Sequence, residues 1–162
     1  MIMIMNNIRS GKMELSHYKH KIIEVVRFHE VDILGVCNNA VYFNFFEDAR
    51  IKYLQDIKKI FPMKEFLEGD SFFIMVHNDC DYIESAHLED ELNIYTRINF
   101  IKNSSFGFKH IVENNNTRKI IARGGGAVVH INRITKKSIP IPQEFYDAVQ
   151  KFEKHVEIIK SF

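Results

Sequence analysis

The sequence predicts an α+β fold in which an antiparallel sheet wraps round one long central helix, with a second helix near the C-terminus. The central helix, which ends near Ile57, is apolar over so wide an arc that other structure must cover it, because a surface helix buries one narrower face. Several strand-like segments follow without another long helix between them, an order typical of this class. At 162 residues, with 46% hydrophobic and 27% charged residues, the chain suits one domain with a core. We expect that domain at residues 16–162, after a flexible extension at residues 1–15.

The first strand and the central helix are predicted by their apolar patterns. Residues 16–28 are polar at their beginning and β-branched at their end, which predicts a strand. A loop with Asp32 and Gly35 follows and ends in Asn38 and Asn39, whose side-chain oxygens can accept the unpaired N–H groups of a first helical turn. The central helix then carries one apolar stripe at helical spacing: Tyr42, Phe46, Ala49, Tyr53 and Ile57.

The chain after the central helix predicts a connection, four strands and a closing helix. The connection is expected at residues 58–70, with a short helical turn at residues 63–67. The strands are expected at residues 71–82, 92–101, 106–113 and 118–132. A run of glycines at residues 124–126 interrupts the last strand, which predicts a β-bulge or a close approach of the backbone to the central helix. Residues 143–160 are amphipathic and predict the closing helix.

The composition narrows the class of function. The formal net charge is +1 and the charges are well mixed, which gives no footprint for nucleic acid or for an acidic membrane. The two cysteines, Cys37 and Cys80, show neither a disulfide framework nor zinc-ligand spacing, which suits reduced thiols in the cytoplasm. The apolar run at residues 1–5 is too short for a secretory segment or a membrane span. We therefore expect a cytoplasmic protein without membrane or nucleic-acid partners.

One motif, between Arg27 and Leu54, resembles a known family. It reads Arg-aromatic-x-acid-x-Asp-x-x-Gly, then Tyr42 ten residues after Asp32, then Phe-Phe-Glu-Asp-Ala-Arg. This joint spacing is similar to the hot-dog-fold acyl-CoA thioesterases of the 4-hydroxybenzoyl-CoA thioesterase type, and the resemblance extends over residues 19–152. It implies hydrolysis of an acyl-CoA to a free acid and coenzyme A, without a metal or other cofactor. It also implies a homodimer or homotetramer with active sites at the subunit interface.

The resemblance implies a catalytic role for three residues of the loop. Asp32 matches the catalytic carboxylate, acting either as general base for water or as nucleophile, whereas the residues alone allow a turn or capping aspartate. Gly35 is a turn glycine whose surrounding N–H groups would polarise the thioester oxygen. Asn39 stands where many relatives have histidine; because asparagine is neither acid nor base at neutral pH, we expect it to cap the helix.

Further residues are candidates for substrate binding. Tyr42 is a pocket wall or a core residue. Glu47 either reaches the acyl group, as the acid does in relatives, or forms an i,i+3 ion pair with Arg50, which is the favoured interpretation. His77 lies in a strand near the expected acyl chain and is a strand histidine rather than a catalyst. In relatives the turn that corresponds to Lys102, Asn103 and Ser105 holds the phosphates of coenzyme A.

Three other functions fit the sequence less well. An acyl-carrier-protein thioesterase would present a basic patch to an acidic partner, which the near-neutral charge disfavours. A non-catalytic acyl-CoA binder would typically lack the carboxylate, whereas Asp32 is present. A purely structural oligomerisation module is supported only by the generic fold. The abundance of Phe, Tyr and Met (fourteen, six and six) suits a fatty or aromatic acyl group.

Overall fold

The computed structural model describes residues 14–61 and 70–159. The expected N-terminal extension, apart from Glu14 and Leu15, and the expected helical turn at residues 63–67 lie outside the described residues. Glu14 itself forms an ion pair with Arg123, with 2.9 Å between the carboxylate and Nη2.

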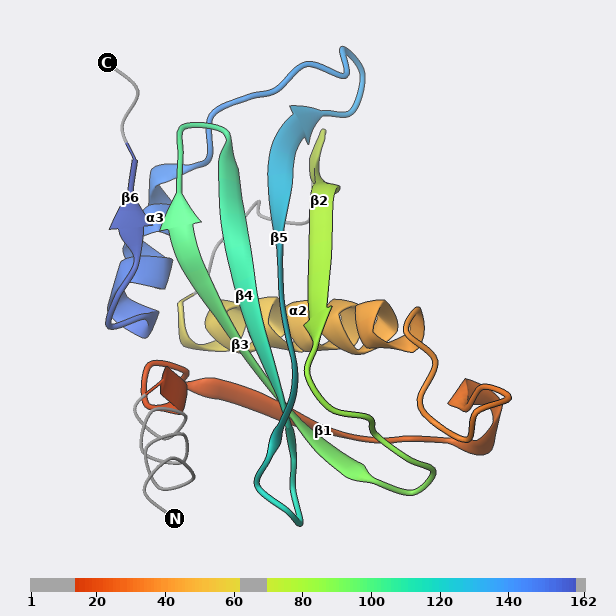
Figure 1. Cartoon of the computed structure of the whole chain (residues 1–162). Coiled ribbons are helices and arrows are strands. Elements are labelled where there is room, and N and C mark those ends of the chain that lie inside the picture. Colours follow the sequence, from red (N-terminus) through yellow and green to blue (C-terminus); the bar gives the residue numbers. More distant parts are fainter. Residues whose placement is uncertain (1–13, 62–69, 160–162) are drawn as a thin grey trace.

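The elements follow one another as a strand, a long helix, four strands, a short helix and a short strand (Figure 1). Their bounds are β1 His20–Val25, the 3₁₀ helix η1 Phe28–Glu30, α2 Val41–Ile60, β2 Ser71–Tyr82, β3 Glu91–Ile101, β4 Ser105–Asn114, β5 Ile120–Asn132, α3 Gln143–Phe152 and β6 Glu157–Ile158. The predicted α+β class is confirmed, and the predicted limits of β2 are correct to the residue.

The sheet has the strand order β1-β3-β4-β5-β2, with β6 pairing in parallel with β3. The four pairings along the main path are antiparallel. β2 follows α2 in the element order but pairs with β5, at the edge of the sheet opposite β1. β1 and β2 are therefore the two edges of the main path.

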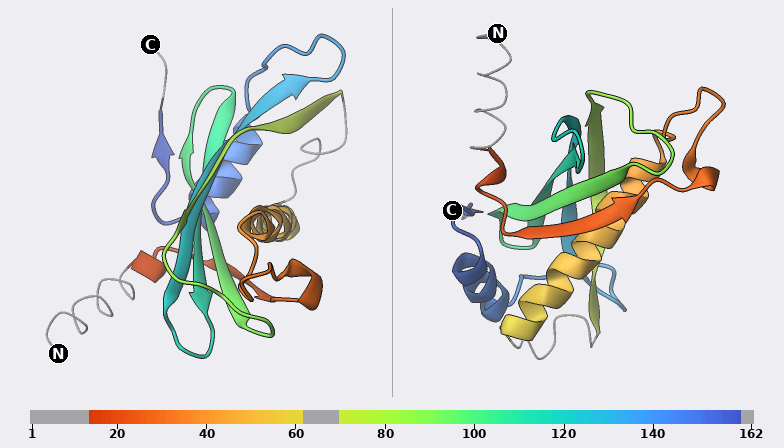
Figure 2. Two further views of the ribbon diagram at one scale, coloured as in Figure 1. Left: turned by 45° about the vertical axis from the view of Figure 1, so that its right-hand side comes forward. Right: turned by 90° about the horizontal axis from the view of Figure 1, so that it is seen from below.

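The sheet curves round α2, which lies against one face and crosses the strands obliquely (Figure 2). Burial of α2 follows the predicted stripe: all five stripe residues are at most 2% exposed. The core forms two clusters along the helix. One cluster includes Tyr42, Phe46 and Ala49, and the other includes Tyr53 and Ile57. A helix covered in this way is fixed by tertiary packing, which fixes the position of the loop before it.

The glycine run in β5 lets the sheet approach α2 closely. A Cβ atom on Gly124 would lie 2.4 Å from the Phe46 ring, so only glycine fits this contact. The predicted close approach is therefore correct. The alternative prediction of a bulge in this run is wrong, because the glycines keep regular register with β2. The register shift in β2 lies instead between Met75 and His77.

The closing helix is shorter than predicted. α3 ends at Phe152, and the chain then runs extended and adds β6 to the edge of β3. β1 pairs with β3 only as far as Thr96, which leaves the second half of β3 without a neighbour on that side. Pairing of β6 with Phe100 and Ile101 satisfies part of this edge, and this tertiary contact outweighs the helical pattern of residues 153–160.

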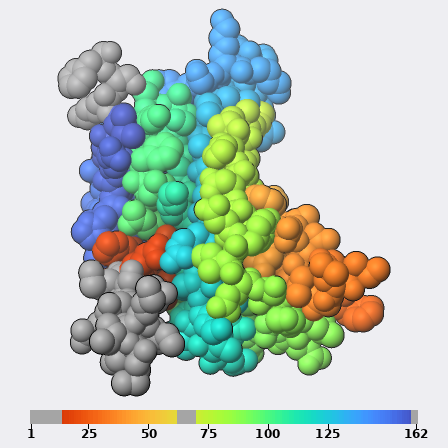
Figure 3. Space-filling model, viewed as in Figure 1, coloured from red at the N-terminus to blue at the C-terminus, as the bar shows by residue number. Residues whose placement is uncertain are grey.

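In the part of the chain that the structure describes, neither α2 nor α3 covers the other face of the sheet. Figure 3 shows this outer face, where β2, β4 and β5 reach the surface of the molecule. Along β2 the exposed side chains include Ile74 and Val76, which are 37% and 55% exposed. Among residues 14–61 and 70–159, no helix is long and apolar enough to cross a membrane.

Candidate active site

The loop between β1 and α2 is tied together by its own backbone. The buried Glu30 accepts the Arg27 N–H with its side chain at 2.7 Å, and its backbone carbonyl accepts the Asn38 N–H at 2.8 Å. Isolated bridges join the loop to itself and to the segment before β3: Val31 with Cys37, and Val36 with His87. The loop is therefore a defined structure that holds its residues at the start of α2.

Asp32 lies partly buried in a turn that its own side chain closes. Its Oδ1 accepts the Leu34 N–H at 2.8 Å and the Val36 N–H at 3.5 Å, and its N–H donates to the Val36 carbonyl at 2.9 Å. Among the described residues, Oδ2 has no hydrogen-bond partner. The role of a turn aspartate thus accounts for one carboxylate oxygen and leaves the other open to water or substrate.

Gly35 adopts the left-handed conformation, with φ 77°. Its N–H donates to the Asp32 carbonyl at 3.0 Å, so this amide closes the turn and is not open to a substrate. The next amides, of Val36, Cys37 and Asn38, also donate within the chain. In this stretch the N–H of Asn39 is the one for which the described residues provide no acceptor, and it lies at the positive end of the α2 dipole.

The expected helix cap at Asn39 is wrong. The N-cap residue of α2 is Ala40, whose own side chain makes no capping hydrogen bond, and the Ala40 N–H donates to Oδ1 of Asn38 at 2.9 Å. The Asn38 side chain reaches only the residue before the helix because it closes a local Asx turn. Asn39 is exposed, and its carbonyl accepts the hydroxyl of Tyr82 at 2.8 Å.

Tyr42 is a core residue. It is 2% exposed, and its ring packs edge-on against Tyr82 and Phe45. Burial raises the pKa of its hydroxyl far above the ordinary value, so Tyr42 stays protonated. Its structural role is to fix the first turn of α2 against β2.

Glu47 and Arg50 do not form the predicted ion pair. Glu47 is exposed, and no carboxylate among the described residues lies within 4.0 Å of the Arg50 guanidinium. The Arg50 Nη1 atom is instead buried without a hydrogen-bond partner. Burial lowers the pKa of Arg50, against the opposing attraction of Glu47. The sequence gives the i,i+3 spacing of Glu47 and Arg50, but it does not show in which direction each side chain points.

His77 lies on the outer face of the sheet. Its Nε2 is 3.1 Å from Oδ2 of Asp79, and its side chain is 66% exposed. The register shift after Met75 reverses which side chains of β2 face the helix, so Cys80 packs against the core and Tyr82 against Tyr42. His77 is thus directed away from α2, so within one protomer it does not line the helix face where the acyl chain is expected.

Lys102, Asn103 and Ser105 form the turn between β3 and β4, as expected. The Lys102 N–H donates to the Ser105 carbonyl at 2.7 Å, and its ammonium lies 5.5 Å from the centre of the Phe100 ring. Asn103 lines a hollow of about 860 Å³ beside α3 and β6. In Figure 1 this turn lies at the C-terminal end of β3. The segment before β3, which contacts the loop that carries Asp32, lies at the other end of the strand. One protomer therefore does not bring the turn and Asp32 together.

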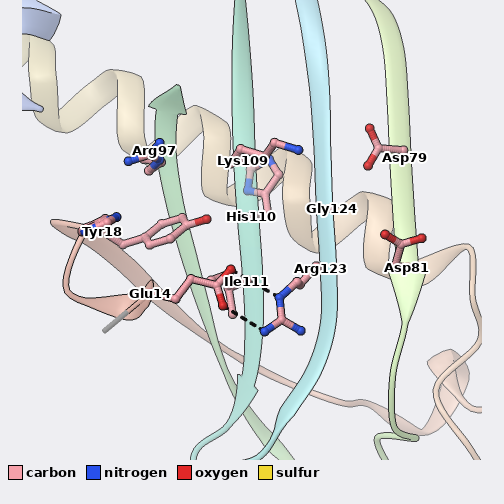
Figure 4. A pocket seen from close by; sticks show the side chains of 11 residues that line it. Glu14, Tyr18, Asp79, Asp81, Arg97, Lys109, His110, Ile111, Arg123 and Gly124 are labelled. Atoms are coloured by element: carbon pink, nitrogen blue, oxygen red, sulfur yellow. Dashed lines mark hydrogen bonds and ion pairs between the residues drawn. The ribbon is translucent and has the colours of Figure 1, made fainter. Parts of the chain in front are cut away.

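A second hollow, of about 310 Å³, lies on the outer face of the sheet (Figure 4). Its cationic side chains come from three neighbouring strands: Arg97, Lys109 and Arg123. Glu14 neutralises Arg123, and Asp79 and Asp81 line the side formed by β2. This hollow mixes both charges and is separated by the sheet from the helix face.

Three unsatisfied polar groups lie on the helix face of the sheet or on α2 itself, and the sequence analysis identified neither Asn78 nor His110 among them. Asn78 Oδ1, His110 Nε2 and Arg50 Nη1 are buried without a hydrogen-bond partner. The register shift in β2 concealed Asn78, because strict alternation from Phe73 and Met75 directs it outward. Cys37 is no nucleophile, since burial and the nearby charges of Glu30 and Asp32 raise its thiol pKa to about 12.

Comparison with known families decides the class of this fold. Residues 26–149 match the family model described as the thioesterase-like superfamily, which is most of the chain. The chain belongs to the thioesterase-like superfamily. Its fold is the hot-dog fold, as the loop motif predicted. No group of three or more His, Cys, Asp or Glu side chains within residues 14–61 and 70–159 is placed to hold a metal ion.

Individual relatives agree with this membership. YsmA of Bacillus subtilis, an uncharacterised protein, is 33% identical over 89 residues, which span 55% of this chain and 57% of YsmA. The acyl-CoA thioesterase YbgC of Haemophilus influenzae is 28% identical over 120 residues, 74% of this chain and 85% of YbgC. The crystal structure of PA5185 from Pseudomonas aeruginosa superposes with a TM-score of 0.73 at 25% identity, covering 85% of this chain and 94% of PA5185.

Proposed function

We propose that this member of the superfamily hydrolyses acyl-CoA thioesters, with Asp32 as the catalytic carboxylate. The observation that carries the proposal is the asymmetry of the Asp32 carboxylate. Backbone N–H groups hold Oδ1, while Oδ2 has no partner among the described residues. An oriented carboxylate with one free oxygen, placed just before a helix N-terminus, suits attack on a carbonyl group.

Two routes use this geometry. In the first, Oδ2 takes a proton from water as the water oxygen attacks the thioester carbon, and the carbon–sulfur bond then breaks to release coenzyme A and the free acid. In the second, Oδ2 attacks the carbon itself and displaces the thiolate, and water hydrolyses the resulting anhydride. In both, the Asn39 N–H and the α2 dipole would stabilise the negative oxygen of the tetrahedral intermediate.

The proposed active unit is a homodimer formed through β2. β2 is an edge strand of twelve residues, and its unpaired side offers a row of N–H and C=O groups to another strand. Apolar side chains of the Asp32 loop are strongly exposed in the single protomer: Phe28 84%, Ile33 101% and Leu34 81%. A second copy would cover both features, since clustered exposed apolar side chains mark an interaction surface.

The same dimer would complete the substrate site. In Figure 1 the turn between β3 and β4 is at the upper left and the Asp32 loop is at the lower right. A two-fold axis perpendicular to the sheet at the edge of β2 carries the partner's turn to the lower right. Lys102 of one copy would then contribute a charge for the phosphates of a substrate whose thioester lies at Asp32 of the other. A dimer of dimers, the other assembly that the family resemblance implies, would add a second such pair.

The test is release of free coenzyme A from a panel of short, long and aromatic acyl-CoAs, with matching acyl groups on acyl carrier protein. We expect hydrolysis of part of the acyl-CoA panel. Turnover confined to acyl carrier protein would replace coenzyme A as the carrier. Saturable binding of acyl-CoA without any turnover would contradict the proposal and identify a binding protein.

A further inference from the structure

An unpaired positive charge lies on the central helix. Arg50 follows Phe46 by one turn, its Nη1 is buried without a hydrogen-bond acceptor, and no described carboxylate lies within 4.0 Å of it. Arg50 as a whole is partly buried, and a partly buried guanidinium without a partner is favourably placed to pair with a carboxylate. The structure therefore leaves this guanidinium available to an anion from outside the described chain.

His110 provides a second unsatisfied group next to Arg50. It is 1% exposed and stacks on Phe46, with the ring centroids 4.6 Å apart and the planes 8° from parallel. Its Nδ1 is 2.9 Å from the Thr96 hydroxyl in β3, which turns the unpartnered Nε2 toward β5. Burial and the charges of Arg50 and His20 lower the pKa of His110 well below its usual value, so the ring is neutral near pH 7.

Asn78, on the edge strand β2, is a third unsatisfied polar residue on the helix face of the sheet. Its buried Oδ1 has no partner, and a Cβ atom on Gly126 would lie 3.2 Å from it, which places the amide beside the glycine run of β5. Rotation of the amide exchanges Oδ1 for Nδ2, so Asn78 can offer a donor there. Thr96 can donate to His110 Nδ1, and then Nε2 of His110 is a donor too.

The flank of α2 that carries Arg50 faces β2. Phe43, seven residues before Arg50, packs on the same core cluster as Cys80 of β2, and Leu54, four residues after, packs on the same cluster as Met75. Arg50 therefore lies along a line from the start of α2 toward the middle of β2. Nine residues separate it from the first residue of the helix, about 13 Å along the axis.

We propose that Arg50, assisted by Asn78 and His110, binds a carboxylate at the far end of the acyl group, so that the preferred substrates are ω-carboxyacyl-CoA thioesters of medium length. This inference rests on the proposed function. The reacting thioester lies at Asp32, before the helix, and the acyl chain runs along α2 to the guanidinium. A bidentate carboxylate would form an ion pair with it.

The kinetic test compares decanedioyl-CoA with decanoyl-CoA, which differ only in the terminal group. We expect wild type to favour decanedioyl-CoA in kcat/KM by about 10- to 100-fold, as for a charge-assisted hydrogen-bonded pair, and Arg50→Met to abolish this ratio. Arg50→Lys keeps the positive charge but cannot form two parallel hydrogen bonds to a carboxylate, so it should give an intermediate kcat/KM ratio. Lys52→Met, on the exposed side of the same helix, should leave the ratio unchanged.

A binding arm separates this inference from the proposed function. Calorimetry measures the affinity of both thioesters for Asp32→Asn and for Asp32→Asn/Arg50→Met. A preference for decanedioyl-CoA that is present in Asp32→Asn and absent in Asp32→Asn/Arg50→Met supports binding of the terminal carboxylate by Arg50, even if no variant turns over substrate. Hydrolysis by wild type without a preference for decanedioyl-CoA, or a preference that persists in Arg50→Met, would overturn the proposed carboxylate binding by Arg50. Either result would still agree with the proposed thioesterase activity.

A structural role for Arg50 predicts a different pattern. If Arg50 pairs with Glu47 in solution, Arg50→Met and Glu47→Gln should lower the melting temperature equally and leave the kcat/KM ratio unchanged. We expect instead that Arg50→Met keeps or raises the melting temperature, since replacing an unpaired, partly buried charge by an apolar side chain removes its desolvation cost. Equal destabilisation with an unchanged ratio would overturn the proposal.

Discussion

His110 shows at the scale of one residue what burial does to a titratable group. Its folded-state pKa lies well below 6.5, while in the unfolded chain it returns to about 6.5. Below pH 6.5 the unfolded chain therefore binds a proton that the folded protein does not. The stability that His110 contributes is complete above pH 6.5 and is lost as the pH falls toward the folded-state pKa.

Replacing His110 by glutamine should therefore flatten the pH dependence of stability. Between pH 7.5 and 5.5 the free energy of unfolding of wild type should fall by up to about 1.4 kcal/mol in total more than that of His110→Gln. Urea unfolding at the two pH values measures this difference. The raised pKa values of Glu24 and Glu153 act in the opposite direction but cancel in the comparison. His155→Gln, at an exposed site, serves as the control, and equal slopes for wild type and His110→Gln would contradict the assignment.

Single residues also show which features of the candidate site could be predicted from the sequence and which could not. The spacing around Asp32 predicted its place before the helix, because the motif is local in the chain. The pairing of Glu47 with Arg50 was predicted wrongly, since i,i+3 spacing brings two side chains near each other but tertiary packing sets their directions. Asn78 was missed because one extra residue in β2 reverses the alternation of its side chains.

At the scale of elements, the fit of β5 against α2 depends on the absence of a side chain at Gly124. We expect Gly124→Ala to destabilise the protein by about 1–3 kcal/mol, because the new methyl group would meet the Phe46 ring and force repacking. Chemical denaturation measures the loss. Gly125→Ala, whose methyl group would face the opposite side of β5, should cost less, and equal costs would show that contact with α2 is not the cause.

The elements themselves were largely predictable, and their ends were less so. Apolar periodicity located α2 and the strands because burial imposes it directly on the sequence. α3 was predicted too long because the pattern of residues 153–160 suits both a helix face and an extended chain. Pairing with the free edge of β3 stabilises the extended conformation. This edge exists only after the sheet has formed, so the local sequence does not reveal it.

At the scale of the whole molecule, the proposed active site uses residues from two copies of the chain. We expect the double variant Ile74→Lys/Val76→Lys to prevent formation of the proposed dimer, because a pair of β2 edges would then bring like charges together. Turnover should fall with dimer content. Sedimentation velocity and coenzyme A release, measured on the same samples, check both effects.

The matched control for this variant is Ile23→Lys. Ile23 is 54% exposed and lies on β1, the other edge of the sheet. It should remain dimeric and active. A wild-type protein that is monomeric and fully active would contradict the shared site, because the turn at Lys102 and the Asp32 loop lie too far apart in one protomer.

The most direct test of the central claim is the rate of coenzyme A release by Asp32→Asn beside wild type, with Asp81→Asn on the outer sheet face as control. The amide can still close the Asp32 turn through its Oδ1, so the loop should stay folded, while the free oxygen loses its ability to take a proton or attack carbon. We expect a fall of roughly 10²–10⁴-fold for Asp32→Asn and near wild-type rates for Asp81→Asn. A folded Asp32→Asn enzyme that retains wild-type turnover would show that the chemistry lies elsewhere.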